Sequence, residues 1–571
     1  MLRTASDRAR GRVSLFPASG QCRTLDTNRD RSATCGRLFR MHDLPALSPL
    51  LLAIAGWLPV ASARGQEPGL RAAVPEEAIV VVEMADPVAA TRSLLQAVGG
   101  IPPGLKERMG VAAWTGLAAM WIAVDGDPEA FATQVSGGGA VLALVPDGRK
   151  PQAVLLLRPH DVPATERWCT KFAGKLPRQV VDGVLVLSAD QQLVAATAAR
   201  VARAKGRWAD IDFGPAAAMR GAIDVAAIRR GLGNKAPTFA SLEAGAKFLL
   251  LPFAPVVTDA AMVTFAVRGG DRLVVTATTA NSVRTTPLSA MLPAAGQATE
   301  VPLPADGLAS LRLDRSLRTL LQQPERLLKP AEVLSVQGFL SIADAIDGPH
   351  SSFVDDLVGG LGEPFTLLLL PITPPVDGPP SRLQLPGLAL VARIHDPKAE
   401  KVLFRVAEAF GLIANTERSQ RGQSPFPLRL RRSEAGRGLV GEPLPWRGPG
   451  APPIEQGLSP TLWCENGHAV LASTYDAAMA ALAAVRQAGT TPTEPMGDRL
   501  VLRGPAIGAA IAASRPVFEL GRVLDEGEEP ATATQFFDVL DIVANALHEV
   551  TFAVQCAATT TTVELSVERA R

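Results

Sequence analysis

The sequence is poor in the side chains that most often carry catalysis or bind metals. Its 571 residues include six His, five Cys and one Tyr. No C-x-x-C, H-E-x-x-H or G-x-S-x-G motif occurs, so nothing indicates a zinc site, a metalloprotease or a serine hydrolase. We therefore predict no metal ion and no cofactor.

Glycine clusters are present, but they stand before apolar strands. They are Gly137-Gly138-Gly139 and Gly359-Gly360 with Gly362. A phosphate-binding loop instead leads from a strand into the N-terminus of a helix, so these glycines are predicted to form turns or close packing points. Asp125-Gly126-Asp127 lacks the later acidic positions of a calcium loop.

The cysteines do not form the pattern of a disulfide framework. Beyond the first 65 residues only Cys169, Cys464 and Cys556 remain, an odd number at wide spacing. Cys169 lies in a predicted helix and the other two in predicted strands. We expect buried, unreactive thiols, although the sequence leaves open whether two of them pair.

The first 65 residues have the pattern of a targeting segment. An apolar run at Leu50–Leu58 follows arginines and precedes the small-residue site Ala61-Ser62-Ala63, which predicts a secretory signal peptide ending near Ala63. The run is short for a membrane span, although an uncleaved anchor is the alternative. Met41 is a plausible start of translation. We expect an exported protein, periplasmic or extracellular, without an integral membrane span after cleavage.

Charge outside this leader is nearly balanced. The chain has 57 basic and 56 acidic residues, and ten of the arginines but only four of the aspartates fall in the leader, so the remainder is slightly acidic. Nucleic acid is therefore not a predicted partner. One region, about 415–459, is rich in Gly, Pro and Arg. It is interpreted as a solvated loop or extended hairpin, or alternatively as a site for an anionic partner, through Arg418, Arg421, Arg429, Arg431, Arg432, Arg437 and Arg447.

Two distant segments, Val263–Val267 and Val550–Val554, both read VTFAV. Other landmarks recur in the same order, including an apolar stretch at Val194–Thr197 matched to Val470–Ser473, each followed by an alanine-rich helix. The spacing is far longer than a solenoid repeat. We therefore predict a tandem duplication with a first repeat at 66–285, a linker at 286–298 and a second repeat at 299–571.

The predicted fold class is α+β, with each repeat a mainly antiparallel sheet covered by helices. Alternation in VTFAV indicates a half-buried strand. Continuous apolar runs at Val141–Val145 and Leu367–Leu370 indicate central strands, each returning through a hairpin. Helices are expected where Asp precedes Pro and where leucines or other apolar residues follow the 3.6-residue period, as at Leu313, Leu317, Leu320 and Leu321 and at Phe536, Leu540, Val543 and Leu547.

One polar pattern, Arg-x-His-Asp, occurs in both predicted repeats where a strand passes into a helix. A His beside a carboxylate can act as a general base or a ligand, which makes catalytic candidates of Arg158, His160, Asp161, Arg393, His395 and Asp396. The alternative is structural: each Asp caps a helix, and each His ends a strand with bonds to nearby backbone. Adjacent residues point in different directions, and no third catalytic partner is identifiable.

The segment Val74–Glu83, followed by Asp86-Pro87, resembles the start of an uncharacterised family of exported bacterial proteins with duplicated α+β units. The resemblance lies in the repeated strand–helix and hairpin units of both predicted repeats and in no diagnostic motif. It implies an envelope or extracytoplasmic protein and supplies no activity, cofactor or site residue.

Three functions remain as hypotheses. The first is a non-catalytic scaffold or interaction protein of the cell envelope with an unidentified envelope partner, favoured by the duplication and the missing motifs. The second is a carrier of an apolar ligand, suggested by the apolar content and by amphipathic helices beside sheets. The third is a hydrolase that uses one of the His/Asp pairs.

Overall fold

The structure is a computed structural model in which the unit Ala55–Arg571 contains all described residues. These are residues 69–85, 139–147, 151–172, 176–203, 205–214, 217, 219–233, 236, 238–269, 272–292, 301–348, 351–371, 385–443, 457–488, 497–525 and 527–569. The predicted leader, the predicted helix starts at Asp86 and Asp127, and part of the Arg-rich region lie outside them.

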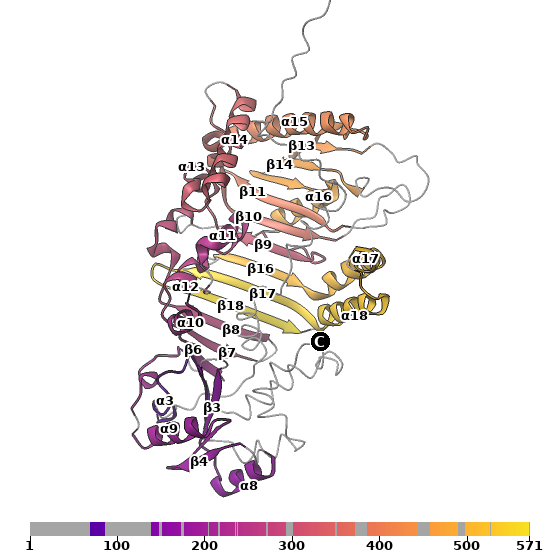
Figure 1. Cartoon of the computed structure of the whole chain (residues 1–571). Coiled ribbons are helices and arrows are strands. Elements are labelled where there is room, and N and C mark those ends of the chain that lie inside the picture. Colours follow the sequence, from indigo (N-terminus) through magenta and orange to yellow (C-terminus); the bar gives the residue numbers. More distant parts are fainter. Residues whose placement is uncertain are drawn as a thin grey trace, which may run out of the picture. The chain divides into compact units, whose positions relative to one another are not determined.

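One antiparallel sheet of 18 strands organises the chain (Figure 1). Its first eight strands pair in the order β4-β5-β3-β2-β1-β6-β7-β8. Their bounds are β1 Val80–Met84, β2 Ala140–Val145, β3 Gln152–Leu157, β4 Arg178–Val181, β5 Val184–Ser188, β6 Met219–Ile223, β7 Val263–Arg268 and β8 Arg272–Thr279.

The other ten strands pair in the order β12-β13-β14-β15-β11-β10-β9-β16-β17-β18. This is the order of the first eight with the hairpin β12–β13 added at the outer end. The bounds are β9 Ala309–Leu313, β10 Leu361–Leu370, β11 Gly387–Ile394, β12 Leu428–Arg432, β13 Gly436–Gly441, β14 Thr461–Glu465, β15 His468–Ala472, β16 Asp498–Arg503, β17 Leu547–Cys556 and β18 Thr561–Arg569.

The last strands of the two sets, β8 and β18, pair with each other and make the sheet continuous. Thr276 faces Glu564 at the centre of this seam. On either side, Val275 faces Leu565 and Ala277 faces Val563. In the adjoining hairpins Val267 faces Val275, and Val554 faces Val563. Val275 of β8 and Val563 of β18 therefore hold equivalent places in their hairpins. The next residues, Thr276 and Glu564, are equivalent as well, and they face each other at the centre of the seam.

A single cross-strand register carries one apolar residue from every strand onto one face of the sheet. Directly opposed residues of an antiparallel pair project to the same side. We call this set the apolar row: Val180, Leu185, Leu157, Ala140, Met84, Met219, Val267, Val275, Leu565, Phe552, Leu500, Leu311, Leu367, Leu390, Leu471, Leu462, Leu439 and Leu430.

The opposite face is covered by α9 (Gln191–Val201) and α16 (Tyr475–Gln487), each packed on its own core. Alanine lets α16 approach the strands closely: Ala477, Ala478 and Ala481 are buried. A Cβ at Gly387 of β11 would lie only 2.8 Å from the Cβ of Ala477. Small side chains on both elements therefore set the distance between this helix and the sheet.

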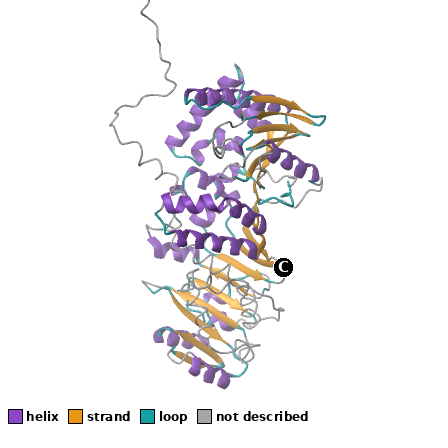
Figure 2. Ribbon diagram, turned by 90° about the vertical axis from the view of Figure 1, so that its right-hand side faces the viewer, coloured by secondary structure: helices purple, strands orange, loops and turns teal. Residues whose placement is uncertain are grey.

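Apart from α3, which precedes β1, the remaining helices lie in the connections between strands (Figure 2). Corresponding connections carry corresponding helices: α8 and α15 follow β3 and β11, and α10–α12 and α17–α18 precede β7 and β17. The bounds are α3 Gly69–Ala72, α8 Val162–Phe172, α10 Val225–Leu232, α11 Ala244–Leu249, α12 Ala254–Thr258, α13 Leu317–Gln322, α14 Pro330–Asp347, α15 Pro397–Gln420, α17 Gly504–Asp525 and α18 Pro530–Ala546. None of the helices described is both long and apolar enough to span a bilayer.

Helices and an antiparallel sheet agree with the α+β prediction, and the hairpins β2–β3 and β10–β11 are confirmed. Other expectations are wrong. Leu313 ends strand β9 and Leu547 begins strand β17, so neither belongs to the predicted helical pattern. Val194–Thr197 lies within α9, whereas its supposed match Val470–Ser473 runs from strand β15 into the following turn. Short apolar strings have no periodicity that separates helix from strand.

The continuity of the sheet can be tested by amide hydrogen exchange. Both β8 and β18 have partners on two sides, whereas β12 pairs only with β13 among the described strands. We expect peptides covering 272–279 and 561–569 to exchange roughly 100-fold more slowly than a peptide covering 428–432, equivalent to about 3 kcal/mol of opening free energy. Equal exchange rates would contradict the pairing of β8 with β18.

Candidate functional site

The apolar row is partly exposed where it crosses the outer strands of the second set, although Leu439 and Leu462 are buried there, each 5% exposed. From β16 to β12 it consists of eight leucines. Leu390 is 37% exposed, Leu471 56% and Leu430 51%. By contrast, Phe552, nearer the middle of the sheet, stacks with Phe253 at a ring-centroid distance of 6.2 Å. Leu390 and Leu471 face each other across β11 and β15, and adjoining exposed apolar side chains mark interaction sites more often than isolated ones do.

Helix α15 lies over this part of the row. It begins after Asp396, whose Oδ1 accepts a hydrogen bond from the Lys398 amide at 2.8 Å. Its N-terminal half is held in the core: Phe404 packs with Leu439 and Leu462. Further along, the stripe that faces the sheet continues at helical spacing through Val406, Ala407, Phe410, Gly411 and Ala414.

Between the C-terminal half of α15 and the strands is a pocket of about 480 Å³. This volume falls within the range of small-molecule sites, about 300–1,000 Å³. Gly411 lets β12 approach the helix, because a Cβ there would lie 2.3 Å from Leu428 Cδ1. The strands and loops contribute Phe426, Leu428, Leu439, Gly441, Pro460, Thr461, Leu462 and Leu471 to its wall.

The polar groups of the pocket wall bond mainly to the protein itself. Asn415 exchanges two hydrogen bonds of 2.7 Å with the backbone of Phe426. Thr461 Oγ1 donates to the Ser459 carbonyl at 2.7 Å. Among the described residues that line the pocket there is no His, Cys, Asp or Glu. A wall of this composition can bind an apolar group.

The six residues singled out from the sequence lie elsewhere: Arg158, His160, Asp161, Arg393, His395 and Asp396 are absent from the pocket wall. Asp161 caps α8 by accepting the Ala164 amide at 2.9 Å, as Asp396 caps α15. His160 and His395 are exposed.

The surroundings of the second pattern are tight. A Cβ at Gly362 would lie 2.0 Å from His395 Nε2, so the imidazole ring rests against this glycine. Arg393 stands opposite His468 in the ladder. Burial lowers the pKa of His468, and the positive charge of Arg393 lowers it further. No group of three or more potential ligands is arranged to hold a metal ion in the part of the chain that the structure describes.

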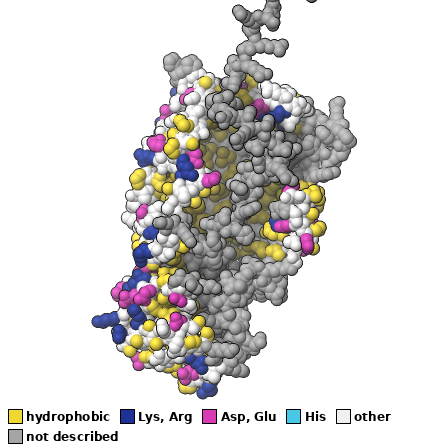
Figure 3. Space-filling model, in the orientation of Figure 1, with side chains coloured by type: hydrophobic (Ala, Val, Ile, Leu, Met, Phe, Trp, Pro, Cys, Tyr) yellow, Lys and Arg dark blue, Asp and Glu magenta, His cyan; other side chains and the backbone are white. Residues whose placement is uncertain are grey.

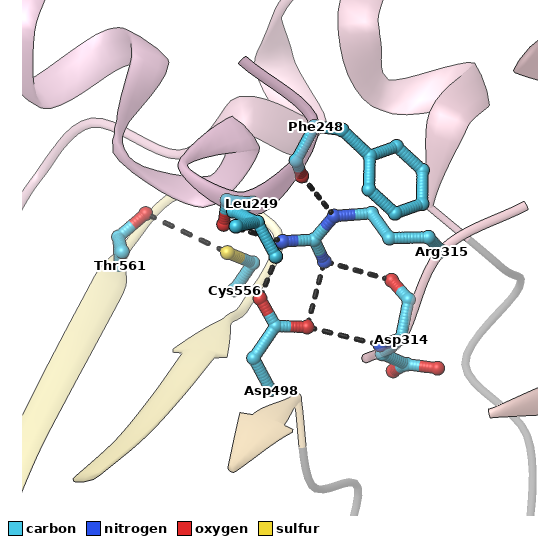
Figure 4. Close-up of polar contacts among 7 residues, drawn as sticks. All are labelled: Phe248, Leu249, Asp314, Arg315, Asp498, Cys556 and Thr561. Atoms are coloured by element: carbon cyan, nitrogen blue, oxygen red, sulfur yellow. Dashed lines mark hydrogen bonds and ion pairs between the residues drawn. The ribbon is translucent and has the colours of Figure 1, made fainter. Parts of the chain in front are cut away.

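A second polar cluster, which the sequence did not suggest, is centred on the buried Arg315 (Figure 4). Its Nε donates to the Phe248 carbonyl at 3.1 Å, and its Nη2 to the Leu249 carbonyl at 3.3 Å. Nη1 donates to the Asp314 carbonyl at 2.9 Å and to Asp498 Oδ1 at 2.7 Å, and Nη2 also pairs with Asp498 Oδ2. All five N–H groups of the guanidinium are therefore used.

Two carboxyl groups around this arginine have raised pKa values. Burial raises the pKa of Asp498, against the opposing charge of Arg315. Burial also raises the pKa of Asp314, opposed first by Arg312. Shifted carboxyls often mark active sites, but structural ion pairs shift them too. Because Arg315 has no donor left for a ligand, the cluster is structural: it joins α11 to the ends of β9 and β16.

A further apolar surface lies on the helical hairpin α17–α18 (Figure 3). The two helices pack through stacked rings of Phe518 and Phe537, 6.2 Å apart. Large apolar side chains nevertheless remain exposed on both, namely Phe518, Leu520, Leu524, Phe536 and Ile542.

Cys169, Cys464 and Cys556 are free thiols. Burial raises the pKa of Cys169 to about 11 and that of Cys464 to about 12. It also raises the pKa of Cys556.

Comparisons with known protein families, with curated proteins and with solved structures find no match to this chain. The pocket must therefore be interpreted from its own geometry.

Removing the charge of Arg315 should destabilise the fold strongly. Arg315→Met leaves the Asp498 carboxylate buried without its partner, which costs about 3–5 kcal/mol. We expect a matching loss in the free energy of unfolding, measured by urea denaturation. The double variant Arg315→Met with Asp498→Asn removes the buried charge and should regain part of that loss. No recovery in the double variant would contradict the role of the ion pair.

The thiols should be slow to react in the folded protein. A pKa near 11 in place of 9.0 lowers the thiolate fraction of Cys169 at pH 8 by roughly 100-fold, and that of Cys464 by more. Alkylation with iodoacetamide at pH 8, followed by peptide mapping, should therefore label both sites only after denaturation. Rapid labelling of the folded chain would show that these residues are accessible thiolates.

Proposed function

We propose that the protein is an exported, non-catalytic carrier that holds an apolar ligand between α15 and strands β12–β15. The observation that carries this proposal is the pocket of about 480 Å³ with a wall almost entirely of apolar side chains. Apolar pockets with few polar groups are the usual sites for small molecules.

Burial of exposed apolar surface supplies the driving force. Phe410 is 40% exposed and Leu428 37%, and both line the pocket together with the more exposed Leu471. Each Å² of apolar surface removed from water contributes about 25 cal/mol. A ligand that covers these three side chains therefore stabilises the complex without any directed bond.

The pocket is built from the parts that distinguish the second set of strands from the first. Helix α15 has 24 residues, whereas α8, in the corresponding connection, has 11. The hairpin β12–β13 has no counterpart among the described strands of the first set. Both additions border the pocket, which favours a ligand-binding role specific to this part of the chain.

We further propose that residues 66–285 and 299–571 are two copies of one α+β unit. The shared pairing order and the matched positions at the β8–β18 seam support this. Export is supported by the apolar run and small-residue site at residues 50–63.

A scaffold role is the second candidate, and the surface of α17–α18 favours it. Its exposed Leu520 and Leu524, at 56% and 71%, suit a protein partner of the envelope better than a small molecule. The two roles are compatible, because this surface and the pocket share no lining residue.

Native mass spectrometry of the protein isolated without detergent tests the carrier role. We expect an added small mass that is lost on denaturation. Ala414→Trp, which places an indole in the pocket, should weaken binding about tenfold, equivalent to about 1.4 kcal/mol of steric cost, and so lower the bound fraction.

Thr416→Trp is the matched control. Thr416 is exposed on the same helix but does not line the pocket, so this variant should retain the bound mass. A bare polypeptide in the wild type would refute the carrier role, and a second protein chain attached in its place would favour the scaffold.

A further inference from the structure

One charged residue, Arg418, belongs to the described wall of the pocket. It lies in the last turn of α15. Its Nε donates to the Ser424 carbonyl at 2.7 Å, and its guanidinium carbon lies 4.5 Å from the centroid of the Phe426 ring. The side chain is therefore held against the loop between α15 and β12, by a hydrogen bond and a cation–π contact.

The loop that holds Arg418 is itself fixed. Asn415, one turn earlier on the helix, makes both of its hydrogen bonds to the backbone of Phe426. Ser424 and Phe426 are therefore positioned relative to α15 before any ligand binds. A guanidinium oriented in advance loses less freedom when it pairs with an anion.

Most nearby arginines are paired with carboxylates; Arg418 and Arg432 have no acidic partner among the described residues, and of these two Arg418 lines the pocket. Arg421 pairs with Glu417, Arg431 with Glu442 and Arg437 with Glu400. The hydrogen bond and ring contact of Arg418 involve Nε and the face of the guanidinium. Both terminal nitrogens remain for an anion, in the fork geometry that fits a carboxylate or phosphate.

We infer that the ligand is an amphiphile with one anionic head group, which pairs with Arg418, and an apolar tail, which lies along α15 towards Leu471. This inference rests on the proposed carrier function. The positive charge of region 415–459, which has seven Arg and four Glu, agrees with an anionic head group. An uncharged head group would leave the two terminal nitrogens of Arg418 without an anion to pair with.

The test compares ligands that differ only in the head group. The full chain, stripped of bound ligand, is titrated with hexadecanoate, hexadecyl phosphate and hexadecanol, each below the concentration at which it aggregates. We expect the wild type to bind at least one of the two anions about tenfold more tightly than the alcohol, or about 1.4 kcal/mol. The stronger anion identifies the head group.

Variants separate recognition of the head group from structural effects. Arg418→Gln should remove the preference for the anion, because it weakens binding of the anions more than binding of hexadecanol. Arg421→Gln, at an exposed arginine outside the pocket wall, should keep the preference.

Three results would overturn the inference. Equal affinity of the wild type for the anions and the alcohol would refute the head-group site but leave the carrier function standing. An equal loss for all ligands in Arg418→Gln would assign Arg418 a structural role only. Binding of no ligand would refute the carrier function and the inference together.

Discussion

The cross-strand register of the 18-stranded sheet is the constraint on which the other features depend. Side chains alternate between faces along a strand, so a slip of one residue would move a whole strand's apolar set to the wrong side. The apolar row runs without interruption from Val180 to Leu430. It gives the sheet one face for α9 and α16 and another on which α15 can form a pocket.

The buried ion pair between Arg315 and Asp498 also depends on the strand register. Asp498 begins β16, and it accepts hydrogen bonds from the Asp314 amide and from Arg315, which follow β9. A shifted register between these two strands would separate the charges and leave both buried without a partner. Removing one partner of such a buried pair is strongly destabilising, and Arg315 also fixes α11 through the carbonyls of Phe248 and Leu249.

The sequence predicts local structure well where pattern and turn chemistry agree. The hairpins β2–β3 and β10–β11, the caps at Asp161 and Asp396, and the helix or strand setting of the three thiols could all be read from it. The helix at Val194–Thr197 could not be predicted, because four small residues suit a helix and a strand equally. Leu547 fits the helical period of α18 but begins β17, where tertiary pairing outweighs the pattern.

The pocket was beyond prediction for a different reason. Its walls come from a helix and from strands that are distant in the chain, and Leu471 is contributed by a strand whose order in the sheet no local pattern reveals. A hint was present in Leu403, Ala407, Phe410 and Ala414, whose helical spacing leads up to the region interpreted as a solvated loop or extended hairpin. Alternating Leu and Arg at 428–431 likewise indicated a strand with one apolar face. Arg315 gave no signal, because a single arginine in a sequence does not reveal its burial.

The most direct test of the account is to find where an apolar ligand touches the chain. A hexadecanoate carrying a photoreactive diazirine at the end of its tail would be bound, irradiated and located by peptide mapping. The account predicts labels confined to α15 between 403 and 414 and to the strands facing it at 428–441 and 461–471. Labels on the first set of strands, or spread evenly along the chain, would contradict a pocket between α15 and β12–β15.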